Sequence, residues 1–156
     1  MDYKSKIILI AGPTASGKSK IAINKEKKID GEIINADSMQ VYKQLKILTA
    51  RPTGEDRKNI KHHLFGIIDV RKRFSTGQWL KECIKTINLI RKRKNVPIIV
   101  GGTGLYFKAL VDGLVRIPKF KPSDKNKILK LHNKLGQNQF YKKLIKLDPI
   151  SKKFVN

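Results

Sequence analysis

Short apolar runs alternate with polar and glycine-rich segments along the first two-thirds of the chain. The runs predict four strands, over residues 6–11, 32–35, 63–70 and 96–100. Between them, apolar positions recur at helical spacing and predict helices over residues 18–29, 77–94 and 105–111. Because strands and helices alternate, the pattern predicts an α/β fold with a parallel sheet flanked by helices.

Some details of these elements follow from single residues. The first strand, KIILIA at residues 6–11, lacks polar alternation, which predicts burial on both faces of a sheet. Gly31 is expected to end the first helix as its C-terminal glycine. Thr76 is expected to cap the second helix, and Gly66 to interrupt the third strand.

The character of the chain changes after Gly113. A basic, proline-containing stretch leads to Ser123, which is expected to cap a helix that Gly136 stops. A second helix is expected over residues 137–147, ending before Asp148 and Pro149. The pattern predicts a helical appendage, separate from the α/β part.

Composition narrows the class of protein. The chain has 156 residues, of which 40% are hydrophobic and 30% charged, so it is too apolar to be wholly disordered. Its one cysteine, Cys83, excludes an internal disulfide. No segment has the pattern of a signal peptide or an apolar run of membrane-spanning length, so we expect a cytoplasmic protein with no membrane partner.

The net charge of +23 is concentrated in the second half of the chain. Residues 1–83 carry 17 basic and 9 acidic side chains, a net +8, whereas residues 84–156 carry 18 and 3, a net +15. Such a surface attracts a polyanion such as RNA. A compositional bias toward Lys, Ile and Asn explains the charge equally well, so both interpretations stay open.

The segment between the first strand and the first helix matches the phosphate-binding motif G-x-x-x-x-G-K-[ST]. Its glycines allow the backbone N–H groups to wrap an anion at a helix N-terminus. Lys18 is expected to neutralise a terminal phosphate and Ser19 to hold Mg²⁺. The predicted diphosphate-binding residues are Gly12, Pro13, Thr14, Ala15, Ser16, Gly17, Lys18 and Ser19.

Two polar residues follow the second and fourth strands, where the ligands of parallel α/β proteins bind. Asp37 can act as a general base or orient an amine, but it can also cap the next helix. Thr103 lies in the turn GGTG and can bind a ligand through its hydroxyl, or simply cap the helix after it.

The remaining histidines and the basic runs do not predict a specific site. His62, His63 and His132, with a single cysteine, give no ligand set at zinc spacing, so packing or hydrogen bonding is expected of them. The basic runs at residues 71–73 and 91–94 are interpreted as solvated surface, with RNA contact as the alternative.

Several segments together resemble the tRNA dimethylallyltransferase family. They occur in one order over residues 6–114 and are GPTASGKS, NADSMQVY, TARP, HHL, FS and PIIVGGTGLYFKAL. The phosphate-binding loop alone would not be specific, but its combination with ADSMQVY and GGTGLYFKAL is.

The resemblance implies a P-loop NTPase-like core and a prenyl transfer. Members of the family move the dimethylallyl group of dimethylallyl diphosphate onto N6 of the adenine just 3′ of the anticodon, with Mg²⁺. By this resemblance the loop holds diphosphate rather than ATP, and Asp37 and Thr103 are catalytic. The implied tRNA-binding residues are Asp37, Ser38, Met39, Gln40, Thr103 and Lys125. The implied partners are the tRNA anticodon stem-loop and the diphosphate donor, and we expect a monomer.

The chain also departs from the family pattern. Leu48 stands where the family usually has glycine, and Lys125 where it has an arginine, so a bidentate fork is lost. The sequence stops soon after Pro149, where family members continue. We therefore expect residues 1–113 to form an incomplete P-loop core without its final strand. Residues 114–156 would begin the tRNA-binding insertion domain.

Three alternatives remain at this point. A related adenylate isopentenyltransferase would prenylate a free nucleotide, which the basic C-terminal half disfavours. A P-loop kinase would need a Walker-B aspartate, for which Asp69 is a weak candidate. A shortened chain could also bind diphosphate and RNA without catalysis.

Overall fold

The computed structural model describes residues 6–54, 60–115 and 121–155. The chain divides into two compact units, Met1–Leu114 and Val115–Asn156. The first unit contains all of the described strands, and the second contains helices alone. The two units are therefore described separately.

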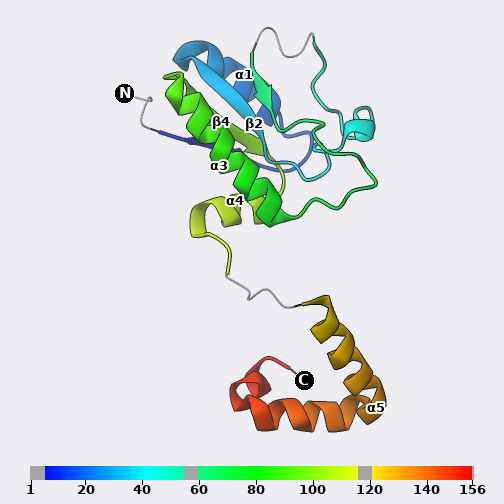
Figure 1. The fold of residues 1–156 in the computed structure, drawn as a ribbon. Coiled ribbons are helices and arrows are strands. Elements are labelled where there is room, and N and C mark those ends of the chain that lie inside the picture. The colour runs from blue at the N-terminus through cyan, green and yellow to red at the C-terminus, as the bar shows by residue number, and fades with distance from the viewer. Residues whose placement is uncertain (1–5, 55–59, 116–120, 156) are drawn as a thin grey trace. The chain divides into compact units, whose positions relative to one another are not determined.

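The first unit is built on a parallel sheet, as the alternating pattern predicted (Figure 1). Its order is β1-β4-β2-β3, so the two central strands are β4 and β2. Ile98 of β4 pairs with Ile8 on one side and with Ile33 on the other. The strands are β1 Ile8–Ala11, β2 Gly31–Asn35, β3 His62–His63 and β4 Val96–Gly101.

Helices cover both faces of this sheet. Helix α1, Lys18–Ile29, contributes Ala22 to a core cluster with Ile33 and Ile98. On the opposite face, α3 (Thr76–Lys92) and α4 (Gly104–Asp112) form a second cluster around the neighbouring strand residues. Its members are Ile34, Ala36, Val41, Leu64, Trp79, Cys83, Ile87, Ile90, Ile99 and Tyr106.

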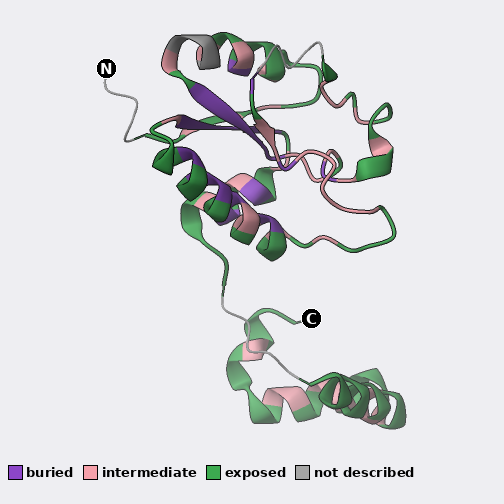
Figure 2. Cartoon of the chain, turned by 45° about the horizontal axis from the view of Figure 1, so that its top comes forward, coloured by how far each residue is buried: buried purple, intermediate pink, exposed green. Residues whose placement is uncertain are grey.

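Strand β1 differs from the central strands in its burial. Every residue of β2 and β4 is buried, whereas exposed and half-buried residues alternate along β1, and Leu9 is 41% exposed (Figure 2). Among the described residues β1 pairs only with β4, so it lies at the edge of the sheet. The prediction that this strand is buried on both faces is therefore wrong.

The third predicted strand, residues 63–70, is also largely wrong. Only His62 and His63 pair with β2, and the chain then turns away from the sheet. The turn is made by two residues with positive φ, Leu64 at 63° and Gly66 at 59°. In the described chain, the rest of this segment forms one isolated β-bridge, between Ile68 and Tyr42.

Two helix ends use other residues than those predicted. Asp30, with φ of 50°, takes the left-handed position after α1, while Gly31 opens β2. A Cβ on Gly31 would lie 2.5 Å from Ile98 Cδ1, so close strand packing explains this glycine. Ser75, not Thr76, caps α3: its hydroxyl accepts from the Gln78 N–H while the Gln78 side chain accepts from the Ser75 N–H.

The amino end of β2 carries a buried carboxylate, Glu32, whose side chain is 2% exposed. Arg93 donates two hydrogen bonds to it, at 2.9 and 2.7 Å, and Asn95 donates a third at 2.9 Å. Nε2 of His63 lies 2.6 Å from the same carboxylate. Burial raises the pKa of Glu32, but these hydrogen bonds outweigh it and lower the pKa to about 2. Glu32 thus joins β2, β3 and the end of α3.

The second unit holds α5, Pro122–Leu147, and the short 3₁₀ helix η2, Pro149–Lys153. Gly136, at φ 72° and ψ 167°, breaks α5 into two helices, as predicted. The first of them starts after Lys121 with Pro122 at its first position, so Ser123 is not the cap. None of the residues described in this unit is buried (Figure 2). In the described parts of the chain, no helix is long and apolar enough to span a membrane.

Candidate functional site

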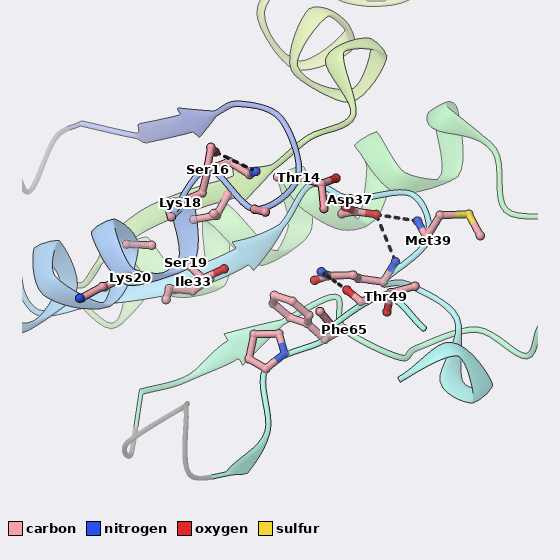
Figure 3. A pocket seen from close by; sticks show the side chains of 18 of the residues that line it. Thr14, Ser16, Lys18, Ser19, Lys20, Ile33, Asp37, Met39, Thr49 and Phe65 are labelled. Atoms are coloured by element: carbon pink, nitrogen blue, oxygen red, sulfur yellow. Dashed lines mark hydrogen bonds between the residues drawn. The ribbon is translucent and has the colours of Figure 1, made fainter. Parts of the chain in front are cut away.

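A cavity of about 650 Å³ opens at the carboxyl ends of the parallel strands (Figure 3). The loop after β1, the segment after β2 and the end of β4 all contribute to its wall. This edge of a parallel sheet collects loops from several strands, which is why α/β proteins bind ligands there. The cavity brings the predicted phosphate-binding loop and the predicted base, Asp37, together.

The phosphate-binding loop turns tightly into the N-terminus of α1. Ala15 and Gly17 have positive φ values of 64° and 79°, and the helix begins at Lys18. The Lys18 ammonium donates to the Pro13 carbonyl and lies 3.4 Å from the Ser16 hydroxyl (Figure 3). The N-terminus of α1 and the Lys18 cation give this part of the cavity a positive potential.

Ser19 lies on the cavity wall and offers one hydroxyl oxygen. In the described parts of the chain, no group of three or more His, Cys, Asp or Glu side chains could hold a metal ion. Mg²⁺ typically takes one or two protein ligands together with substrate phosphates and water. The residues present therefore fit Mg²⁺ that is held jointly by Ser19 and a bound diphosphate.

Asp37 uses one carboxylate oxygen to fold its own loop. Its Oδ1 accepts hydrogen bonds from the N–H groups of Met39, at 2.8 Å, and Gln40, at 3.3 Å (Figure 3). Among the described residues, Oδ2 accepts no hydrogen bond, and the Asp37 side chain lines the cavity. The first oxygen therefore closes a turn at residues 38–41, and Tyr42 holds the N-cap position of the next helix, so the helix-cap interpretation of Asp37 is wrong. The base interpretation concerns the other oxygen and stays a prediction.

Thr103, in the turn between β4 and α4, forms hydrogen bonds with the same loop. Its hydroxyl accepts from the Ser38 N–H at 2.9 Å, and its own N–H donates to the Ala36 carbonyl at 3.1 Å. A Cβ on Gly101 would lie 2.1 Å from that Ala36 carbonyl oxygen, so the close approach of the loop requires glycine there. The Thr103 hydroxyl keeps its proton available for a further acceptor.

A buried aromatic pair, Trp79 and Tyr106, packs next to the end of β2, and the sequence predicted no role at the site for either residue. Trp79 is fully buried, stacks on Tyr106 with ring centroids 4.2 Å apart, and donates from Nε1 to the Asn35 carbonyl at 2.8 Å. Burial, with the nearby Tyr42 and Asp37, raises the pKa of Tyr106 to about 12. A buried tryptophan needs a hydrogen-bond partner, which is the signal that could have indicated this contact.

The opposite wall of the cavity comes from a segment that the sequence indicated only through resemblance. It contains Leu48, Thr49, Ala50 and Pro52, and His62 and Phe65 also line the cavity. Gln40 Nε2 donates to the Thr49 carbonyl at 2.9 Å, which ties this wall to the Asp37 loop.

Some of the predicted site residues line the cavity, and others do not. Thr14 to Ser19 line the cavity, as do Asp37, Met39 and Gln40. The predicted residues that do not line it are Gly12, Pro13, Ser38 and Thr103. Lys125 belongs to α5 in the second unit. Cys83 is buried, which raises the pKa of its thiol to about 12, consistent with a core residue.

Sequence comparison supplies the family. Residues 40–156 match the family model described as IPP transferase. The chain belongs to the IPP transferase family. It is similar to tRNA dimethylallyltransferases from Pelagibacter ubique, with 62% identity over 96% of this chain and 48% of the relative, and from Maricaulis maris, with 44% identity over 92% and 47%.

Solved structures agree with this assignment. A tRNA isopentenylpyrophosphate transferase from Bacillus halodurans matches with a TM-score of 0.71 and 33% identity, over 97% of this chain and 50% of that one. A eukaryotic dimethylallyltransferase acting on tRNA matches with a TM-score of 0.79 and 34% identity, over 96% and 37%. These neighbours place the first unit in the P-loop NTPase-like fold of the IPP transferase family.

The chain spans about half the length of the curated relatives it matches. The activity of those whole proteins is therefore carried to this chain only as a proposal.

Proposed function

We propose that this chain transfers a dimethylallyl group from dimethylallyl diphosphate to N6 of the adenosine 3′ of the anticodon in tRNA. The observation that carries the proposal is the shared cavity, whose lining contains both the phosphate-binding loop and Asp37. A diphosphate leaving group and a base for the incoming amine are the two elements that this reaction needs.

The N6 amine attacks the allylic carbon, the bond from that carbon to the diphosphate oxygen breaks, and diphosphate leaves. Lys18 and the N–H groups at the start of α1 stabilise the negative charge that develops on the leaving group. Mg²⁺, when bound at Ser19, adds a further positive charge to this end of the cavity. Asp37 Oδ2 accepts the proton that N6 loses.

An exocyclic amine is a weak nucleophile, so positioning supplies much of the acceleration. Oδ2 is held in place because Oδ1 is anchored on two backbone N–H groups. Met39 and Gln40, beside Asp37 on the cavity wall, contact the incoming base in this proposal. The base must leave its stack to reach Asp37.

The charge of the chain supports RNA as the acceptor. The net charge is +23, and residues of the second unit such as Lys125 would contact the phosphates of the anticodon stem. We place the reaction in the cytoplasm, where tRNA is available.

The test incubates the purified chain with tRNA and radiolabelled dimethylallyl diphosphate, with AMP as a competing acceptor. Label appearing in tRNA is the expected result. Label in AMP alone would replace the proposal with a free-nucleotide transferase. Salt-dependent tRNA binding without any transfer would show that this chain binds its ligands without catalysis.

A further inference from the structure

Asn35, the last residue of β2, lies two positions before Asp37 and is 1% exposed. Its side chain forms hydrogen bonds with both backbone polar groups of Asp37, an arrangement that we call the bracket. Oδ1 accepts from the Asp37 N–H at 2.9 Å, and Nδ2 donates to the Asp37 carbonyl at 3.0 Å. One side chain thus fixes both backbone polar groups of the proposed base.

The bracket is anchored to two other parts of the fold. The second hydrogen on Nδ2 donates to the Leu64 carbonyl at 3.2 Å, in the turn after β3. The backbone carbonyl of Asn35 accepts from Trp79 Nε1 at 2.8 Å, and Trp79 is fully buried in α3. Both amide hydrogens of Asn35 are therefore used, and the residue connects the Asp37 loop to β3 and α3.

The orientation of the amide is fixed by its partners. If the oxygen and nitrogen of the side chain exchanged places, the NH₂ group would meet the Asp37 N–H. The oxygen would then face the carbonyls of Asp37 and Leu64. Each contact would become repulsive, so the observed arrangement alone satisfies the groups. A hydrophobic residue of similar size would leave three backbone groups without these partners, of which the Leu64 carbonyl is in a buried contact and the two of Asp37 are partly buried.

We propose that Asn35 is a positioning residue for the transfer reaction: through its bracket and Trp79 it sets the direction in which Asp37 Oδ2 points into the cavity. This inference rests on the proposed function of Asp37 as the base. The three hydrogen bonds of the bracket join Asn35 to Asp37 and Leu64 and involve no residue of the phosphate-binding loop, so we expect donor binding to be independent of it. A positioning residue of this kind changes the rate of the chemical step and leaves the donor affinity alone.

The test compares Asn35→Ala, which removes the bracket, with Trp79→Phe, which removes the Nε1 donor together with part of a buried ring. Ile90→Ala is the matched control, because Ile90 is a fully buried residue of the same α3 core with no hydrogen bond to the Asp37 loop. Two quantities are measured on the full chain. One is the hydrogen exchange of the Met39 and Gln40 amides, which donate to Asp37 Oδ1. The other is steady-state transfer.

In Asn35→Ala we expect these two amides to exchange at least about tenfold faster. We also expect kcat to fall about 100-fold, with the KM for dimethylallyl diphosphate within about twofold. Trp79→Phe should change the same quantities in the same direction and by less. Ile90→Ala should lower thermal stability without this pattern.

Exchange in Asn35→Ala that matches Ile90→Ala would overturn the inference, as would faster exchange with an unchanged kcat. If the unmodified chain transfers no label, the proposed function fails for this chain, and the amide exchange still decides whether Asn35 holds Asp37 in place. The two failures are therefore distinguishable.

Discussion

The two ends of β2 carry two carboxylates that the fold treats in opposite ways. At the amino end, the Glu32 carboxylate is buried and accepts from Arg93 twice, from Asn95 once, and lies against His63. Just past the carboxyl end, one oxygen of Asp37 accepts hydrogen bonds from two backbone N–H groups of its own loop. The Asp37 side chain also lines the cavity. The saturated carboxylate joins β2 to β3 and the end of α3, whereas the half-saturated carboxylate lies on the cavity wall.

The difference follows from the direction of a parallel sheet. Loops that leave the carboxyl ends of β1, β2 and β4 converge at one edge, whereas the amino ends receive the returning helices. The end of α3 and the residues after it therefore reach Glu32 at the amino end. At that end, partners from the end of α3 and the residues after it saturate the carboxylate.

Replacement of Asp37 by Asn should produce the largest effect. We expect the transfer rate to fall about 10³-fold, since the amide cannot take the proton from N6, while diphosphate affinity stays within about twofold. Single-turnover transfer and equilibrium binding of diphosphate measure the two quantities. A parallel loss of rate and binding would instead make Asp37 a structural residue like Glu32.

Glu32→Gln is the reciprocal change and should affect stability rather than chemistry. The substitution removes the charged acceptor of Arg93 and Asn95, and because the Arg93 side chain is 39% exposed and can be solvated, we expect a loss of about 1.5–3 kcal/mol in the free energy of unfolding. Urea unfolding measures it. Asp69→Asn is the control, because Asp69 pairs with Arg71, whose side chain is 86% exposed. Equal losses in the two variants would contradict the distinction between them.

The same carboxylate predicts how stability depends on pH. Because folding lowers the pKa of Glu32 from 4.5 to about 2, its contribution is present above pH 4.5 and is lost as the pH falls toward 2. The loss amounts to about 3 kcal/mol over that window. Unfolding curves of the unmodified chain and Glu32→Gln should therefore converge as the pH falls from 5 to 2. Parallel curves over the whole range would contradict the prediction.

The smallest effect tests the support of the carboxyl end. Gly101→Ala places a Cβ 2.1 Å from the Ala36 carbonyl oxygen and should cost about 1–3 kcal/mol by overpacking. Gly104→Ala is the matched control, since no atom lies within 4 Å of its added Cβ. Thermal unfolding compares the two. A neutral Gly101→Ala would mean that the loop before Asp37 can move away without loss.

Features encoded by local chemistry were predictable from the sequence. The phosphate-binding motif fixes a loop and the start of a helix together, so α1 begins at Lys18 and ends at Ile29, as expected. Asp37 follows a short apolar run, and its position at the carboxyl edge of the sheet then needs no distant information. The break at Gly136 follows from one glycine.

Features that depend on residues far apart in the sequence were not predictable from it. The burial of β1 depends on which strands pair with it, and an apolar run does not encode its neighbours. The third strand ends early because Leu64, a residue that rarely takes positive φ, does so at 63°. The hydrogen bond from Trp79 to Asn35 spans 44 positions, so the apolar spacing that predicted a helix over residues 77–94 could not indicate it.

The half-exposed edge of β1 has a practical consequence for handling the chain. Among the described residues no strand covers its outer side, and Leu9 and Ile7 are 41% and 36% exposed. An uncovered apolar strand edge is a template on which further strands can assemble, including those of other copies. In concentrated solution the chain should thus self-associate through its first strand. A charged residue at position 9 would then improve its yield as a soluble monomer.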